Sequence, residues 1–93
     1  MLLTARRGRV ILGGMKVVRS QFTILLAVRE QRERRRISLR AVARETGLNE
    51  YTVRGFANNT ISEYPARAIA ALCHYLGCEV GDLLTLEDEA EPA

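Results

Sequence analysis

The sequence predicts a single all-α domain of five helices, covering about residues 20–86. Apolar residues recur three and four positions apart in the segment 66–76, which is the spacing of one helix face. Ser38 and Asn49 each stand before a segment of helical pattern, and both residue types cap helix N-termini through a side-chain oxygen. Gly47 stands between these segments, where glycine can end a helix in the left-handed conformation.

Five segments are expected to be helical, and each presents an apolar side to a common core. Their approximate bounds are 20–34, 38–46, 50–57, 66–76 and 80–86, with a loop at 58–65. The residues expected inside are Phe22, Leu25, Leu26, Val28, Leu39, Val42, Ala43, Val53, Phe56, Ile69, Leu72, Cys73, Leu76, Val80, Leu83 and Leu84. A chain of 93 residues suits one such domain with a modest core.

Residues 1–19 form an N-terminal extension to this domain. Two β-rich runs at 9–12 and 15–19 flank Gly13 and Gly14, so they can form a short N-terminal β-hairpin with a two-residue turn. In the alternative interpretation Met15 is the true start, and residues 1–14 are not native. At the other end, residues 87–93 are expected to be a frayed acidic tail.

Charge is distributed unevenly along the chain. Residues 1–67 hold all 14 Lys and Arg against 5 acidic residues, a net charge of +9, whereas residues 68–93 hold 6 acidic residues and no basic one. A basic body with an acidic end is typical of a protein whose partner is a polyanion. No run of 18 apolar residues suggests a membrane span, and no secretory signal pattern is present, so we expect a cytoplasmic protein.

The residues that could carry chemistry are few. Cys73 and Cys78 are the only cysteines, and His74 is the only histidine. A disulfide is open in principle, but buried thiols are favoured in a reducing compartment, and a metal site would need more ligands. No nucleophile with a base, phosphate loop or metal cluster is evident, so we expect no enzyme, no cofactor and no metal.

The segment 39–56 has the pattern of a helix-turn-helix. Two short helices that meet at a steep angle need a small residue at their contact, a glycine at the turn and apolar residues on both inner faces. These requirements are met at fixed offsets by Ala43, Gly47, Leu48, Val53 and Phe56.

On these residues the chain resembles the Cro/repressor-type helix-turn-helix regulators, also called the xenobiotic-response-element or lambda-repressor-like family. The likeness covers about Phe22 to Leu86 and includes 72–78 with Asp82, Leu83 and Leu84. The resemblance implies a five-helix lambda-repressor-like domain, commonly dimeric, with its third helix in the major groove. Such domains repress by occupying an operator, and they carry no catalytic residues or cofactor.

Three positions depart from the family pattern. Leu39 replaces a frequent glutamine that anchors a phosphate, and Ala57 replaces a frequent acidic residue. Asn59 stands where glycine is usual, although asparagine also tolerates a left-handed conformation. These changes affect the docking geometry more than the fold.

The outward side of the helix at 50–57 is expected to face the bases. Arg54 is the main candidate, because a guanidinium can bond guanine O6 and N7 together. Tyr51 can contact a phosphate or a thymine methyl, and Thr52 lies at the margin. Gly55 would let a groove wall approach closely. Glu50 can accept from cytosine N4 or simply favour the positive end of the helix dipole. The alternative for the whole face is a solvated surface.

A second set of residues is expected to contact the DNA backbone. It combines the start of the second helix with the loop after the recognition helix: Ser38, Arg40, Arg36, Asn58, Asn59 and Thr60, with Arg67 as an addition. The basic end of the first helix, which includes Arg29, is either solvated or bound to phosphate.

The leading hypothesis is sequence-specific binding of double-stranded DNA by a homodimer that acts as a small transcriptional regulator, with repression favoured. Its two recognition helices would lie about 34 Å apart and match a palindrome. The alternative is a protein-interaction module such as an antitoxin, whose partner would be a toxin. A toxin reading frame beside the gene would distinguish the two.

Overall fold

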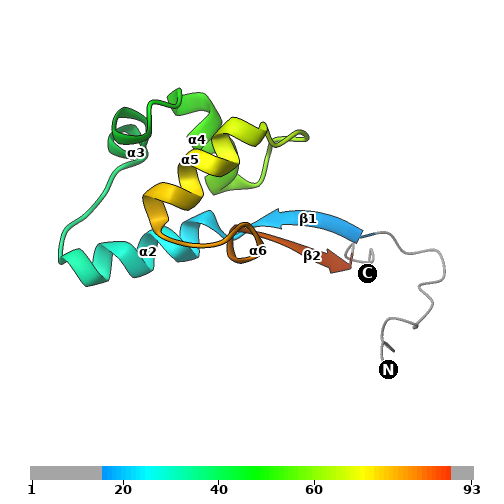
Figure 1. Ribbon diagram of the computed structural model, residues 1–93, viewed down its shortest axis with the longest axis horizontal. Helices are drawn as coiled ribbons and strands as arrows, with labels where there is room; N and C mark the ends of the chain where they lie inside the picture. The colour runs from blue at the N-terminus through cyan, green and yellow to red at the C-terminus, as the bar shows by residue number, and fades with distance from the viewer. Residues whose placement is uncertain (1–15, 89–93) are drawn as a thin grey trace.

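The computed structural model describes residues 16–88, which fold into five helices and a two-stranded antiparallel sheet (Figure 1). In chain order the elements are β1 (Lys16–Ser20), α2 (Phe22–Glu33), α3 (Leu39–Thr46), α4 (Glu50–Asn58), α5 (Ala66–Leu76), α6 (Val80–Leu83) and β2 (Leu84–Asp88). The helices gather together, and the β1–β2 ribbon projects away from them. The predicted set of five helices is confirmed.

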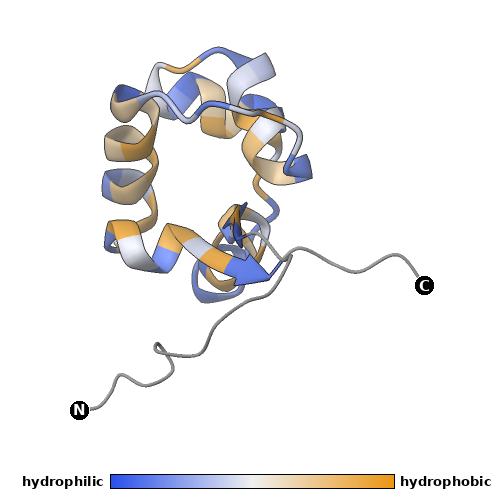
Figure 2. Ribbon diagram, turned by 90° about the vertical axis from the view of Figure 1, so that its right-hand side faces the viewer, coloured by the Kyte–Doolittle hydropathy of each residue, from blue (hydrophilic) through white to orange (hydrophobic). Residues whose placement is uncertain are grey.

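The core forms where the apolar sides of the helices meet. Its largest fully buried side chains are Phe22, Phe56, Leu72, Leu83, Val42 and Val53. Val28 and Val80, which were expected inside, are exposed, because each lies on the outer side of its helix. Figure 2 shows apolar and polar residues alternating along the helices, as amphipathic helices around a shared core require. Burying each of these side chains contributes about 1.5–3 kcal/mol, so the core is the main source of stability.

Left-handed residues end four of the helices. Gly47 and Gly77, predicted as helix ends, have φ angles of 81° and 69°. Arg34 ends α2 at φ 58° and Asn59 ends α4 at φ 57°, and they are the non-glycine residues with positive φ within residues 16–88. The left-handed conformation foreseen for Asn59 is therefore present.

The pairing of the N-terminal strand differs from the local hairpin that the sequence favours. Residues 9–15 of that hairpin lie outside the described residues, and β1 pairs with β2, which lies near the other end of the chain. The register runs from Lys16 opposite Asp88 to Ser20 opposite Leu84. Lys16 Nζ lies 2.7 Å from Asp88 Oδ1, so opposite charges stabilise this antiparallel pairing.

The last helix is shorter than predicted, and part of the predicted acidic tail belongs to a strand. The helix expected at 80–86 ends at Leu83, because Leu84 already has extended dihedral angles and begins β2. Glu87 and Asp88, expected in a frayed tail, belong to the strand, and Arg19 Nε lies 3.2 Å from Glu87 Oε1. Within residues 16–88 no helix has the length and apolar character to span a bilayer.

Candidate nucleic-acid interface

Two capped helices, α3 and α4, form the helix-turn-helix. Ser38 Oγ accepts a hydrogen bond of 3.0 Å from the amide of Ala41, and Asn49 Oδ1 accepts one of 2.8 Å from the amide of Thr52. Both predicted N-caps are therefore present, and Gly47 makes the turn between the helices. These contacts satisfy amides that would otherwise lack partners, and they define where each helix begins.

The inner side of α4 anchors it to the core. Val53 and Phe56 are fully buried, and the ring centroid of Phe56 lies 5.1 Å from that of Tyr64 in an edge-to-face arrangement. Ala43 of α3 is also buried, and Leu48 packs against the same cluster. The inner residues of the predicted motif are confirmed, and their burial determines which side of α4 faces outward.

The outer side of α4 carries polar and aromatic groups in solvent. Tyr51 is 80% exposed, Arg54 and Asn58 are exposed, and Thr52 is half-buried. A tyrosine as exposed as this contributes little to the packing of residues 16–88. The predicted outward positions of Tyr51 and Arg54 are therefore found.

An ion-pair triad joins this side of α4 to α3. The Glu50 carboxylate accepts a hydrogen bond from Nη2 of Arg54, one turn along the same helix, and its other oxygen lies 3.5 Å from Nε of Arg40. Arg40 is 80% exposed and Glu50 is about one-third exposed. The two cations therefore stay accessible while sharing one carboxylate.

The residues predicted to contact the DNA backbone lie before and at the start of α3 and at the end of α4. Arg36 has a side chain that is 98% exposed, with its Nε 4.0 Å from Glu30 Oε2. Ser38, Asn58 and Thr60 are exposed at the start of α3 and the end of α4. The arrangement places a cation and a hydroxyl group at the start of α3, and neutral hydrogen-bonding groups at the end of α4.

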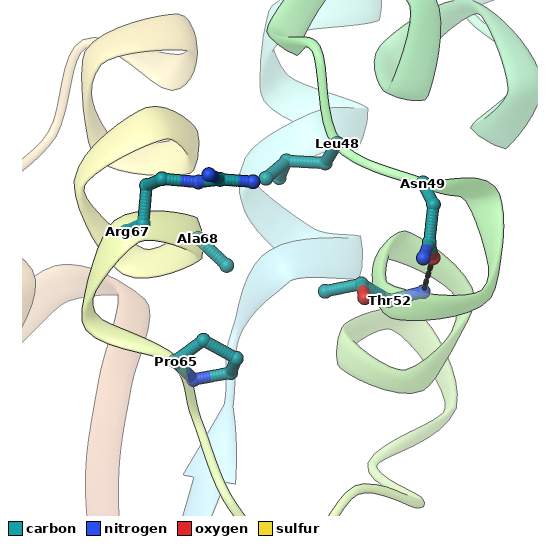
Figure 3. Close-up of a pocket in the computed structure, with 6 residues that line it drawn as sticks. All are labelled: Leu48, Asn49, Thr52, Pro65, Arg67 and Ala68. Atoms are coloured by element: carbon teal, nitrogen blue, oxygen red, sulfur yellow. Dashed lines mark hydrogen bonds between the residues drawn. The ribbon is translucent and has the colours of Figure 1, made fainter.

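A shallow hollow lies between the first turns of α4 and α5 (Figure 3). It has a volume of about 290 Å³ and is lined by Leu48, Asn49, Thr52, Pro65, Arg67 and Ala68. In Figure 3 the Arg67 side chain extends from α5 across the hollow toward Leu48. This brings one more cation close to the beginning of α4.

The model of the Cro/C1-type helix-turn-helix DNA-binding domain matches residues 27–89, well over half of the chain. The chain belongs to this family. Comparisons with the curated proteins and with the solved structures give no match. The Cro/C1-type assignment confirms the resemblance noted from the sequence and supports DNA binding by a small regulator; such domains are typically non-enzymatic.

In this Cro/C1-type domain, Asn59, which was predicted to contact the DNA backbone, has hydrogen-bond partners within the chain. Its Oδ1 accepts a 2.7 Å hydrogen bond from the amide of Ser20, and its Nδ2 donates a 3.2 Å hydrogen bond to the carbonyl of Ser20. The side-chain amide thus pairs with one backbone residue as a neighbouring strand would. Asn59 ties the end of α4 to the end of β1, a contact between distant segments that helical spacing does not reveal.

Gly55 was expected on the outward side of α4 in this Cro/C1-type domain, and this placement is wrong. It is buried, and a Cβ at this position would lie 2.3 Å from Cγ2 of Ile61. The loop after α4 folds back onto the helix here, so the missing side chain makes room for Ile61 instead of a groove wall.

Replacing Gly55 with alanine should therefore destabilise the fold by about 1–3 kcal/mol, despite the higher helix propensity of alanine. Urea denaturation followed by circular dichroism would measure the change. The double variant Gly55→Ala/Ile61→Ala removes the clashing methyl, so the alanine at position 55 should cost less in that background than alone. Equal costs in both backgrounds would contradict this account of Gly55.

Arg29, at the basic end of α2, makes its contacts within the domain. The guanidinium carbon of Arg29 lies 4.0 Å from the ring centroid of Tyr75, and its Nε lies 2.7 Å from Glu33 Oε2. Tyr75 OH donates a 2.9 Å hydrogen bond to Glu45 Oε1, and burial, helped by this bond, raises the pKa of Tyr75. The network joins α2, α3 and α5. The four-residue spacing of Arg29 and Glu33 was the available sequence signal.

The two cysteines are free thiols at the end of α5. Burial, together with the neighbouring Cys73, raises the pKa of Cys78 to about 11, so its thiol stays protonated at neutral pH. Within residues 16–88 no group of three metal-ligating side chains is brought together.

Proposed function

We propose that this protein is a homodimeric transcriptional regulator that binds a specific double-stranded DNA sequence and represses by occupying it, in the cytoplasm. The observation that carries the proposal is the exposed polar side of α4, opposite the buried Val53 and Phe56. A helix anchored on one side and free on the other can enter the major groove, which admits an α-helix.

Within this proposal, Arg54 reads guanine through O6 and N7, because its guanidinium presents paired donors. Tyr51 contacts a thymine methyl or a phosphate, and Thr52 contributes at the margin. Arg36 and Arg40 bind phosphates beside the start of α3, where the free amides of the helix N-terminus also favour an anion. Ser38, Asn58 and Thr60 complete the backbone contacts.

The β1–β2 ribbon supports the proposed homodimer. Val18 and Leu86 are direct partners in the register, and both are exposed large apolar residues on the same face of the ribbon. Lys16 and Asp88 lie opposite each other at the end of that face and carry opposite charges. A second copy related by a two-fold axis would cover the apolar pair and place each charge near its opposite, as a self-complementary interface requires.

Selection from a random double-stranded DNA library tests this function. A palindrome with half-sites about one helical turn apart is the expected result for a dimer. Arg54→Ala should then weaken binding to the selected site by about 1–3 kcal/mol and relax the preference at one base position in each half-site.

Arg44→Ala is the matched control, because Arg44 is an exposed arginine of α3 outside the proposed contacts, and its loss removes the same charge. It should leave the selected motif unchanged. Binding that depends on salt but has no sequence preference would contradict the proposal. That outcome would favour an antitoxin-type module that recognises a protein partner.

A further inference from the structure

The carboxylate of Glu50 contacts guanidinium groups with both of its oxygens. Oε2 accepts from Nη2 of Arg54 and Oε1 lies 3.5 Å from Nε of Arg40. Glu50 lies in the first turn of α4, and Arg54 follows one turn later on the same side. A single acidic residue thus holds one cation of the recognition helix and one cation of the preceding helix.

We infer that Glu50 is a positioning residue that sets base specificity through Arg54 and does not itself read a base. This inference rests on the proposed function. A guanidinium is planar and carries five N–H donors, two of them on Nη2. One Nη2 proton engages Glu50, so the other and those of Nη1 remain available for guanine O6 and N7. The pairing fixes the orientation of the fork before DNA is bound.

Pre-orientation should improve selectivity because an unpaired arginine loses side-chain freedom when it binds. Removing that cost corresponds to roughly a threefold to tenfold gain in affinity for the correct base. Released from Glu50, Arg54 would also reach neighbouring phosphates, which carry no sequence information. Glu50 therefore favours one base contact over several non-specific ones.

The charge of Glu50 has a second effect, which also favours specific over non-specific DNA binding. Its carboxylate offsets part of the positive charge of Arg40 and Arg54 on a surface that would face a polyanion. Non-specific affinity depends on the positive charge of this surface. It falls as the salt concentration rises, and the fall is steeper when more phosphates are neutralised. Removing the carboxylate should thus raise non-specific affinity while lowering selectivity, whereas losing the base-reading Arg54 lowers selectivity and weakens binding as well.

The test compares Glu50→Gln and Glu50→Ala with the unmodified chain, each with and without Arg54→Ala, on the selected DNA and on unrelated DNA. Both Glu50 variants should lower the preference at the base position read by Arg54 by about threefold to tenfold. Binding to unrelated DNA should tighten and depend more steeply on salt. In the Arg54→Ala background, Glu50→Ala should change no base preference.

Glu63→Gln is the matched control, because Glu63 is an exposed acidic residue of the loop between α4 and α5 and its replacement makes the same change of charge. It should tighten non-specific binding without altering base preference. Thermal unfolding followed by circular dichroism confirms that each variant is folded, and Glu50→Gln carries the test if Glu50→Ala is unfolded.

Two outcomes would overturn the inference alone. Folded Glu50 variants with unchanged base preference would show that Arg54 needs no positioning. A preference lost at a different base, and lost equally without Arg54, would show that Glu50 reads that base directly. If the unmodified chain selects no motif, the proposed function falls together with the inference.

Discussion

Replacing Phe56 with alanine is expected to lower the free energy of unfolding by about 3–5 kcal/mol. Phe56 is fully buried on the inner side of α4, and its ring packs edge-to-face on Tyr64. Truncation would remove this contact and leave a cavity beneath α4. The loss approaches the whole stability of a marginal domain, which is about 5–15 kcal/mol.

Urea denaturation of the purified variants measures this effect. Tyr51→Ala is the matched control, since Tyr51 is an aromatic residue of the same helix that is 80% exposed, and its replacement should change the stability by no more than about 0.5 kcal/mol. Phe56→Leu should fall between the two, because leucine fills part of the volume. A loss below about 1 kcal/mol for Phe56→Ala would contradict the assignment of Phe56 to the core.

Asn59→Ala is the second change with a large expected effect, a loss of about 2–4 kcal/mol of stability. Two hydrogen bonds to the backbone of Ser20 would disappear, and alanine would have to adopt the left-handed conformation that Asn59 has at φ 57°. The connection between the end of α4 and the end of β1 would be lost with them.

Asn59→Gly separates the two contributions. Glycine adopts the left-handed conformation without penalty, so this variant should lose only the hydrogen bonds and be more stable than Asn59→Ala by about 1 kcal/mol. Asn58→Ala, at the exposed neighbouring position, is the control for stability. If Asn59 served only as a phosphate contact, Asn59→Ala would weaken DNA binding and leave the unfolding midpoint unchanged.

The helix-turn-helix was the most predictable part of the chain, for reasons local to the sequence. Ser38 and Asn49 cap the helices that follow them within three residues, and Gly47 ends α3 where the pattern indicated. The inward positions of Val53 and Phe56 follow from the helical period alone. These interactions span one or two helical turns, so residue type and spacing suffice to predict them.

The features that the sequence did not reveal are contacts between residues far apart in the chain. β1 pairs with β2 across 64 to 72 positions, whereas the sequence pattern favoured a local turn. Gly55 faces Ile61 because the loop after α4 turns back, and helical spacing alone placed it outward. Asn59 binds Ser20, which lies 39 positions away. Spacing along a helix contains no information about such partners.

The amino-acid sequence alone was enough to predict the five helices, the N-caps of α3 and α4, the side of α4 that faces the core and the resemblance to a DNA-binding family. Local hydrogen bonds and the helical period produce these features, and both depend on neighbouring residues. The folded chain was needed to find which strand β1 pairs with, that Gly55 makes room for Ile61, and that Glu50 contacts Arg40 together with Arg54. These depend on how the segments pack, because a side chain meets its distant partners only after the chain has folded.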